Sequence, residues 1–403
     1  MKLKFTVYLQ ILAAVIAAET LPLEVALAQD EVENPPTLKL DRIMSSPAFA
    51  GQTRAPAAQV SAYEVETLVG GLSLPWALAF LPDEEILISE YATGNMLVLD
   101  DNGKLSEPVS GLPAFSHEGW AGLFDITLDP DYVDNGIVYF SYTAPSGDAE
   151  SPNIPRVARG RLDRANLHMT DVAVLLDGNA WQEMHFTEDG KLLVSGTGAG
   201  DAQDLAASNG KLFRIESDGS PVSDNPFVDN PQALAQIYSY GHRDISGIAT
   251  HPQTGEIWIT EHGPRGGDEL NVIRRGANFG WPVISFGTDY TGEQVGSGKT
   301  SQDGMEQPRY FWRPSIAPSG LMFYSGEMFP EWRGNLFVTS LSGQHITRLV
   351  LQDDRVIAEE RLLVERAERI RELRVGPDGA LYVLTNEEGD APGGTAELLR
   401  IFK

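Results

Sequence analysis

Two arginines near the C-terminal end of the chain are spaced to bind one ligand together. Arg369 and Arg371 stand two residues apart in a run with strand character, so both guanidinium groups project from the same side of a strand. Guanidinium groups bind carboxylate and phosphate oxygens through paired hydrogen bonds. The pair therefore suits a ligand with several such groups. Pairing with acidic side chains of the chain itself is an equally open interpretation of the spacing alone.

Two other segments have the composition of functional loops. Residues 261–269 read Glu-His-Gly-Pro-Arg-Gly-Gly-Asp-Glu, which combines carboxylates with carbonyls that glycines leave accessible. Calcium prefers such oxygen ligands, although an ordinary solvated loop has the same composition. Residues 240–244 read Tyr-Gly-His-Arg-Asp and add one more arginine, Arg243.

The composition excludes several other functions. The chain has no cysteine, so it has neither disulfides nor thiolate metal sites. Its formal net charge of −27 argues against nucleic acid and anionic membranes as partners. The seven histidines lack metal-ligand spacing, and no complete phosphate-binding, dinucleotide-binding or serine-nucleophile motif is present.

One hairpin pattern occurs six times and sets the expected fold. Each copy has a short apolar strand, a turn containing Pro, Asp, Glu or Gly, and a second strand of β-branched and aliphatic residues. Such copies with added strands predict an all-β, six-bladed β-propeller. Residues 64–69 are expected to form the outermost strand of the last blade and close the ring. The first strands of the copies include residues 77–80, 125–128, 184–186, 247–249, 321–323 and 374–375.

The N-terminal region has the features of an export signal. Residues 1–28 combine a basic start, a short apolar run and small residues before a cleavage site, which predicts a signal peptide. The apolar run is too short for a membrane span, so no membrane insertion is expected. Residues 29–60 predict a disordered leader, and residues 61–403 the propeller domain. A periplasmic or secreted protein follows from this order.

From about residue 72 to residue 403 the chain resembles the soluble aldose sugar dehydrogenases that use pyrroloquinoline quinone (PQQ), the glucose/sorbosone dehydrogenase family. Several long motifs in the order of that family carry the resemblance. They are YGHR at 240–243, EHGPRGGDELNVI at 261–273, NFGWPVISFG at 278–287, RPSIAPSGLMFY at 313–324, FPEWRGNLFV at 329–338 and RIRELRVGPDG at 369–379.

The resemblance implies a cofactor, a metal and a reaction. PQQ would lie over the mouth of the central tunnel, an aldose sugar would be oxidised at C1 to a lactone, and an external acceptor would take the electrons. The carbonyls of Gly263 and Pro264 correspond to ligands of the cofactor-bound calcium, and Glu269 and Phe279 to a second, structural calcium position. The positions that correspond to cofactor contacts are Trp120, Arg243, Asp244, Tyr290, Leu341, Ser342, Gly343, Arg369 and Arg371.

The chain departs from the family at the expected catalytic base. The family segment His-Phe-Gly-x-Arg-Leu here reads Asn179-Ala180-Trp181-Gln182-Glu183-Met184, so Asn179 replaces the catalytic histidine beside Arg243 in the site. An amide cannot accept a proton at useful pH. Trp120 replaces a glutamine, and Asp244 places a negative charge near the expected carboxylates of the cofactor.

These departures leave three functions open. The first is a PQQ-dependent aldose dehydrogenase in which Glu183, His185 or Asp244 acts as the base. The second is a catalytically impaired propeller that binds a sugar, a glycan or a protein partner through the same mouth. Trp120 and Trp181 would suit a sugar ring there, although loop tryptophans more often simply pack. The third is a hydrolase that uses calcium alone.

Overall fold

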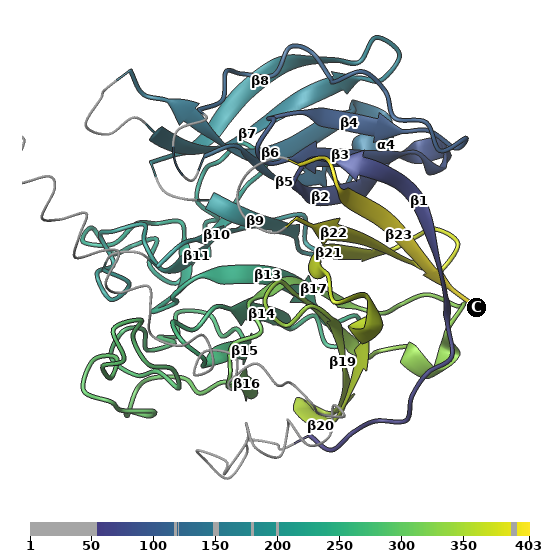
Figure 1. Ribbon diagram of the computed structural model, residues 1–403. Helices are drawn as coiled ribbons and strands as arrows, with labels where there is room; N and C mark the ends of the chain where they lie inside the picture. Colours follow the sequence, from purple (N-terminus) through teal and green to yellow (C-terminus); the bar gives the residue numbers. More distant parts are fainter. Residues whose placement is uncertain are drawn as a thin grey trace, which may run out of the picture. The chain divides into compact units, whose positions relative to one another are not determined.

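Six antiparallel sheets, packed through their inner strands, form the described part of the chain (Figure 1). The computed structural model describes residues 55–116, 119, 121–147, 153–178, 181–198, 201–387 and 393–403. Consecutive inner strands β2, β5, β9, β13, β17 and β21 contact one another, and β21 in turn contacts β2. The ring is therefore closed, and the predicted six-bladed β-propeller is confirmed.

Five blades have four strands, and the first has three. The first three blades are β2 (Pro75–Phe80), β3 (Ile86–Glu90) and β4 (Met96–Leu99); β5 (Leu123–Leu128), β6 (Ile137–Pro145), β7 (Asn153–Asp163) and β8 (His168–Asp177); and β9 (Trp181–Phe186), β10 (Leu192–Gly196), β11 (Lys211–Ile215) and β12 (Ile237–Tyr240). The last three are β13 (Ile245–Thr250), β14 (Ile257–Glu261), β15 (Asp268–Val272) and β16 (Tyr310–Trp312); β17 (Pro318–Phe323), β18 (Leu336–Ser340), β19 (Ile346–Gln352) and β20 (Arg355–Leu362); and β21 (Arg369–Val375), β22 (Leu381–Asn386), β23 (Ala396–Phe402) and β1 (Glu64–Leu72).

In the part of the chain that the structure describes, helical structure is confined to single turns between strands. Within the described ranges, no helix is both long and apolar enough to cross a membrane. The turns are η1 (Pro82–Glu84), α4 (Tyr132–Asn135), η2 (Pro330–Trp332) and η3 (Val364–Arg366).

The N-terminal strand closes the ring as the sequence predicts. β1 pairs antiparallel with β23, so the last blade combines both ends of the described chain. Before β1, the Ala58 amide donates to the Glu359 carbonyl (2.7 Å), and the Glu359 amide donates to Pro56 (2.9 Å). Residues 55–58 of the predicted leader therefore lie along β20. The predicted signal peptide and the leader up to residue 54 lie outside the described residues.

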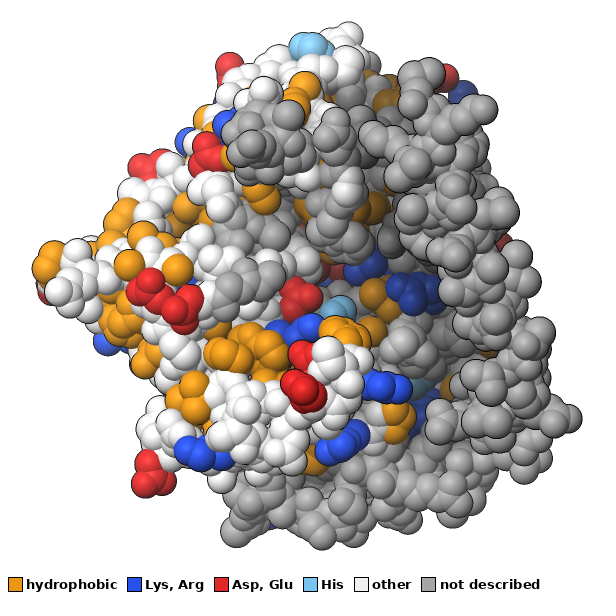
Figure 2. Space-filling view, turned by 60° about the vertical axis from the view of Figure 1, so that its left-hand side comes forward, with side chains coloured by type: hydrophobic (Ala, Val, Ile, Leu, Met, Phe, Trp, Pro, Cys, Tyr) orange, Lys and Arg blue, Asp and Glu red, His pale blue; other side chains and the backbone are white. Residues whose placement is uncertain are grey.

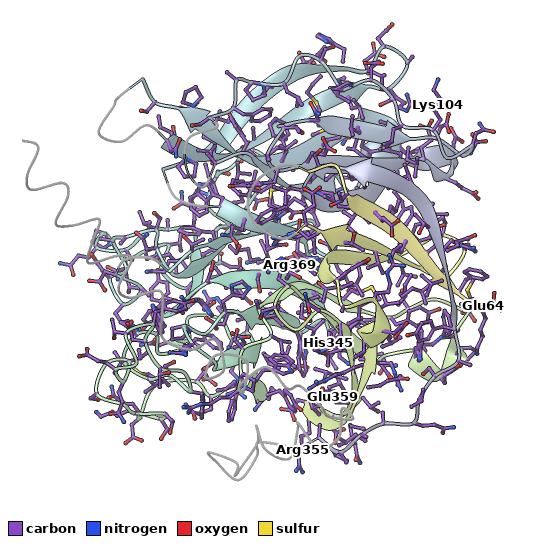
Figure 3. All side chains as sticks on the ribbon, in the orientation of Figure 1. Glu64, Lys104, His345, Arg355, Glu359 and Arg369 are labelled. Carbon is purple, nitrogen blue, oxygen red and sulfur yellow. The ribbon has the colours of Figure 1, made fainter. Side chains whose placement is uncertain are left out.

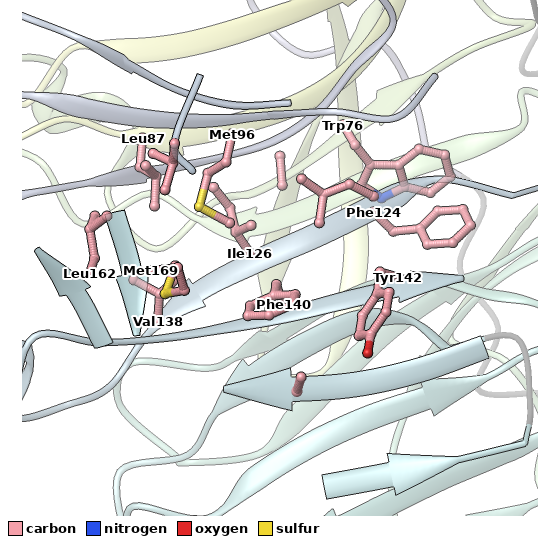
Figure 4. Close-up of a cluster of buried hydrophobic side chains, with 14 of the residues drawn as sticks. Trp76, Leu87, Met96, Phe124, Ile126, Val138, Phe140, Tyr142, Leu162 and Met169 are labelled. Carbon is pink, nitrogen blue, oxygen red and sulfur yellow. The ribbon is translucent and has the colours of Figure 1, made fainter. Parts of the chain in front are cut away.

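Apolar side chains fill the space between neighbouring blades. Figure 4 shows the cluster between the first two blades, where Trp76 and Phe124 meet edge to face with their ring centroids 4.9 Å apart. Trp76 is 4% and Phe124 3% exposed, so their packing contributes about 2 to 3 kcal/mol each relative to exposure. The alternating pattern of the strands places these side chains in the core.

Each inner strand contains a register shift near its first residues. In the second blade, Phe124 and Asp125 together oppose Ser141 on β6. The Ser141 hydroxyl accepts from the Asp125 amide (3.1 Å) and donates to the Gln182 carbonyl on β9 (3.2 Å). Ser89 and Ser195 make the equivalent pairs of bonds. A hydroxyl thus compensates the amide that the bulge removes from the ladder and ties one blade to the next.

The described loops that carry expected site residues lie at one end of the ring. The inner strands start at this end, where Arg243 precedes β13 and Arg369 begins β21. The loops from β14 to β15 and from β18 to β19 return at the same end because each second strand runs antiparallel to its inner strand. Segments distant in the sequence therefore meet at one mouth.

Substitution Ser141→Ala tests the link between blades. We expect the free energy of unfolding to fall by about 1 to 3 kcal/mol, because a buried amide and a buried carbonyl lose their partner. Chemical denaturation measures the change, and Ser220→Ala, in an exposed turn, is the matched control. An equal effect of both substitutions would show that the hydroxyl does not hold the blades together.

Candidate functional site

Arg371 is a buried cation at the mouth of the tunnel. It lies on the bulge of β21, is 8% exposed, and its guanidinium carbon lies 4.0 Å from the ring centre of Trp76. Its Nε atom is buried and has no hydrogen-bond partner among the described residues. Burial lowers the pKa of Arg371 to about 10, while Glu183 opposes this shift. The side chain is therefore still charged at neutral pH.

Arg243 supplies a second cation from the loop before β13. Its Nη1 donates to the His262 carbonyl (3.1 Å), and its guanidinium lies 5.4 Å from the ring centre of Trp281. Within the described part of the chain, neither Arg243 nor Arg371 forms an ion pair with a carboxylate. On the outer strands, by contrast, arginines pair closely with acids, as Arg348 does with Glu360 (2.6 Å). The mouth arginines thus keep charge available for an anion.

Arg369 begins β21 near the middle of the ring in Figure 3. Figure 2 shows basic side chains, acidic side chains and a histidine close together in a hollow in the middle of one face. The two-residue spacing predicted a shared face for Arg369 and Arg371, but the bulge at Arg371 interrupts the alternation between them. The charge of Arg369 lowers the pKa of Arg371, so the two guanidinium groups remain electrostatic neighbours.

Asp244 is balanced electrostatically at the mouth. Burial raises the pKa of the Asp244 carboxyl, while His262, Arg243 and Arg371 oppose this shift. Its Oδ2 atom lies 3.7 Å from Nδ1 of His262. The nearby basic groups therefore reduce the unfavourable effect that its negative charge is expected to have on an anionic ligand.

The acidic glycine-rich loop is fixed by a single buried carboxylate. Asp268, at the start of β15, accepts hydrogen bonds from the amides of Gly263 (2.8 Å), Ile316 (2.7 Å) and Ala317 (2.9 Å). The loop turns through Gly266 and Gly267, both with φ of +77°, a conformation that favours glycine. Asp268 thereby joins the loop after β14 to the loop before β17.

A small cavity behind this loop carries two acids. Glu261, Glu269 and Phe279 are among its lining residues. The Asn271 amide donates to Glu261 (2.9 Å) and to Glu269 (3.1 Å), while its buried Oδ1 atom has no partner in the described structure. Burial, followed by the charge of Glu261, raises the pKa of Glu269 well above its usual value. The cavity is suited to a cation, which would relieve this repulsion.

The other described residues that correspond to cofactor contacts lie on loops around the mouth. Tyr290 is 69% exposed in the turn that begins at Asp289, and Arg243 acts electrostatically on Asp289. The backbone amides of Leu341 and Gly343 donate hydrogen bonds to the carbonyls of residues 317 and 316 (both 2.9 Å). Ser342 lies exposed between them. Trp120 and Asn179 lie outside the described residues.

Two side chains considered as alternatives have structural contacts. Nε2 of His185 lies 2.8 Å from the Thr250 hydroxyl, which agrees with a hydrogen-bonded strand histidine. Trp181 is 3% exposed and packs edge to face on Phe213, with centroids 5.1 Å apart. It therefore belongs to the core and does not offer a platform for a sugar ring.

The sequence identified Glu183 as one possible base, but its clustering with Asp125 and Glu372 was not predicted. Asp125, Glu183 and Glu372 lie at equivalent positions on β5, β9 and β21, directly after the bulge residue. Each stands five residues before the first residue of its hairpin turn, at 130, 188 and 377, so aligning the repeats would have revealed the set. Arg374 pairs with Glu372 (2.7 Å). Burial raises the pKa of Asp125 to about 7, with Glu372 adding to the shift and Arg374 opposing it.

The fold and the mouth define a class of protein: a six-bladed β-propeller with a cationic site and oxygen-rich loops at one end of its tunnel. The sequence profile described as Glucose / Sorbosone dehydrogenase matches residues 72–399. Aldose sugar dehydrogenase YliI of Escherichia coli (strain K12) is 36% identical over 356 residues, which are 84% of this chain and 92% of that protein. The chain therefore belongs to the glucose/sorbosone dehydrogenase family.

Solved structures agree with this assignment. The apo-form of the soluble aldose sugar dehydrogenase from Escherichia coli superposes with a TM-score of 0.78 at 34% identity, covering 84% of this chain and 99% of that one. The PQQ-bound form of an aldose sugar dehydrogenase from Streptomyces coelicolor gives a TM-score of 0.69 at 26% identity, covering 86% and 99%.

Substitution Asp125→Asn tests the tunnel acids through the pH dependence of stability. The folded pKa of Asp125 is raised, so its favourable contribution is present at low pH and is lost as pH rises from about 4 towards about 7. We expect the variant to gain stability relative to wild type by about 2 to 4 kcal/mol between pH 4 and pH 7. Denaturation across this range measures it, with exposed Asp303→Asn as control. A pH-independent difference would contradict the assignment.

Proposed function

We propose that the protein oxidises aldose sugars at C1 to lactones, with PQQ as cofactor and an external acceptor for the electrons. The observation that carries the proposal is the buried Arg371, which has no carboxylate partner among the described residues, together with Arg243 at the same mouth. A buried charge without a partner is costly, so its retention favours a ligand that supplies the opposite charge.

The proposed cofactor fits the charges of this mouth. PQQ is a tricarboxylate, and carboxylates are the groups that Arg243, Arg369 and Arg371 bind best. The orphaned Nε of Arg371 is a donor available to such a group. The loop at 341–343 and Tyr290 lie beside the mouth as further proposed contacts, together with Trp120 and Asp244.

Calcium is proposed at two positions. The carbonyls of Gly263 and Pro264 would hold the ion next to the cofactor, because Asp268 fixes this loop. Glu269 and the Phe279 carbonyl would hold the second ion in the cavity with Glu261. The described residues contain no cluster of three or more His, Asp or Glu side chains arranged for a metal. Both sites would therefore depend largely on carbonyl oxygens.

The reaction divides between cofactor and protein. When bound, PQQ supplies a two-electron acceptor for the hydride at C1. The protein must orient the sugar and accept the proton of its hydroxyl group. Asn179, at the position of the family histidine, cannot perform the second task. We further propose that residues 1–28 direct export, so the protein would act in the periplasm or outside the cell.

Titration of the purified protein with PQQ, with and without calcium, tests the proposed function. We expect binding at micromolar or lower concentration and dye reduction with one or more aldoses. Arg371→Gln is expected to weaken PQQ binding about 30-fold or more, because a buried anion loses its partner. Arg400→Gln, on outer strand β23, removes an ion-paired arginine as the control. No binding of PQQ by the wild-type protein would refute the proposal.

Substitution Asn179→His separates the dehydrogenase from the alternative of a catalytically impaired binding propeller. If the scaffold binds PQQ and lacks only a base, the variant is expected to gain about 10²- to 10⁴-fold in kcat. If another residue already serves as the base, the gain is small. Steady-state kinetics with matched PQQ occupancy measures the difference.

A further inference from the structure

The tunnel contains one layer in which large acids face small residues. Each inner strand supplies one residue to this layer, at the position that follows its bulge. Three of these six residues are acids, and the other three are Ala or Gly. A Cβ atom added at Gly320 would lie 2.9 Å from Oε1 of Glu372, so this carboxylate lies against the neighbouring strand β17. The glycine at position 320 thus leaves the space that the Glu372 carboxylate occupies. The six members are Ala77, Asp125, Glu183, Gly247, Gly320 and Glu372.

Glu183 differs from the other two acids in its contacts. Oδ2 of Asp125 accepts from the Met184 amide (2.6 Å), and Oε1 of Glu372 accepts from Nη1 of Arg374 and from the Leu373 amide (both 2.7 Å). The Glu183 carboxylate has no hydrogen bond to any described residue, although it is only 7% exposed. It is therefore a buried acid with free acceptor positions in the tunnel.

The position of Glu183 is fixed relative to the mouth. Its amide donates to the Ser195 hydroxyl (3.0 Å), which holds the bulge of β9 in place. Glu183 and Arg371 lie at the bulges of β9 and β21, at the same end of the inner strands, and they influence each other electrostatically. Asn179 stands four residues before Glu183, at the approach to the same strand.

We propose that Glu183 accepts the hydroxyl proton of the sugar when the sugar is oxidised. This inference rests on the proposed function and names the base that Asn179 cannot be. The O–H bond of the sugar breaks and its proton passes to a carboxylate oxygen of Glu183. The electron pair left on the sugar oxygen forms the new C=O bond, and the C1 hydrogen leaves with its bonding electron pair as a hydride, for which bound PQQ would be the oxidant. Glu183 later returns the proton to solvent.

The surroundings tune Glu183 for this role. Burial raises its pKa well above the usual value, and the charges of Asp125 and Glu372 raise it further, while Arg374 and Arg371 oppose them. These four groups are the charged side chains that face it from β5 and β21. β13, on its other side, contributes no titratable side chain. A general base is most effective when its pKa lies near the working pH.

The two other candidate bases are less suitable. His185 already contacts Thr250, and burial, aided by Arg374, lowers its pKa to about 4, so it is a weak proton acceptor. Asp244 lies next to His262 and at the position expected for cofactor contact. Asp244 is therefore the competitor that the experiment must exclude.

Glu183→Gln in the PQQ-loaded protein tests the proposal. We expect PQQ binding within about threefold of wild type, a loss of about 10²- to 10⁴-fold in kcat, and loss of the acidic limb of the pH profile of kcat/KM. Glu359→Gln is the matched control, since Glu359 is also a buried acid with a raised pKa but lies on outer strand β20. It should leave kcat and the pH profile unchanged.

A second variant tests the proposal without removing Glu183. Asp125→Asn removes a negative charge that raises the pKa of Glu183, so the acidic limb should move to lower pH by roughly one unit. A purely structural role of the acids would not produce this shift.

The outcomes separate the two levels of inference. Normal kcat and an unchanged acidic limb in Glu183→Gln, with PQQ bound, would overturn the role of Glu183 and leave the dehydrogenase standing. Loss of the limb in Asp244→Asn, and not in Glu183→Gln, would assign the base to Asp244 and also overturn it. Failure of wild type to bind PQQ would overturn the proposed function and this inference together.

Discussion

The bulge at the start of each inner strand is the constraint on which the mouth depends. It takes one amide out of the ladder, and in three blades a serine hydroxyl on the second strand accepts that amide and donates to the next blade. Thr339 likewise donates to the Arg371 carbonyl (3.2 Å). The same geometry therefore fixes the blades to one another and sets the direction of the bulge residues. Because the ring is closed, a change in one bulge must be accommodated by its neighbours.

Electrostatics distinguishes the mouth and tunnel from the outer strands. On the outer strands arginines and acids neutralise each other in direct pairs, as Arg361 and Glu359 do at 2.9 Å. Among the described residues, the tunnel acids Asp125, Glu183 and Glu372 form one direct ion pair, between Glu372 and Arg374, while Arg371 packs on Trp76. Buried charges that are not paired locally remain sensitive to ligands and protons. This is a property of a binding site more than of a stabilising core.

Much of the fold could be predicted from the sequence because the hairpin pattern repeats. Ring closure by β1 was also predictable, since residues 64–69 form an unpartnered strand pattern before the first copy. The path of the long connection from residue 273 to 309 could not be predicted from the sequence. It returns to the mouth through pairs such as Arg265 with Thr288, and no periodicity encodes that path. Aligning the repeats would have shown that the acids Asp125, Glu183 and Glu372 occupy equivalent positions. That they lie together around the central axis follows only from the folded ring.

The acid layer bears on how the expected replacement of the family histidine by Asn179 is interpreted. By the resemblance to the family segment, Asn179 corresponds to the histidine base and Glu183 to an arginine, so a carboxylate on inner strand β9 would take the place of a guanidinium. A carboxylate there makes the tunnel more acidic, which costs stability unless protons are held or exchanged. A group held by a strand bulge and a hydroxyl bond is positioned more precisely than one on a loop. If Glu183 is the proton acceptor as we propose, the two differences within this segment amount to a move of the base from position 179 to position 183.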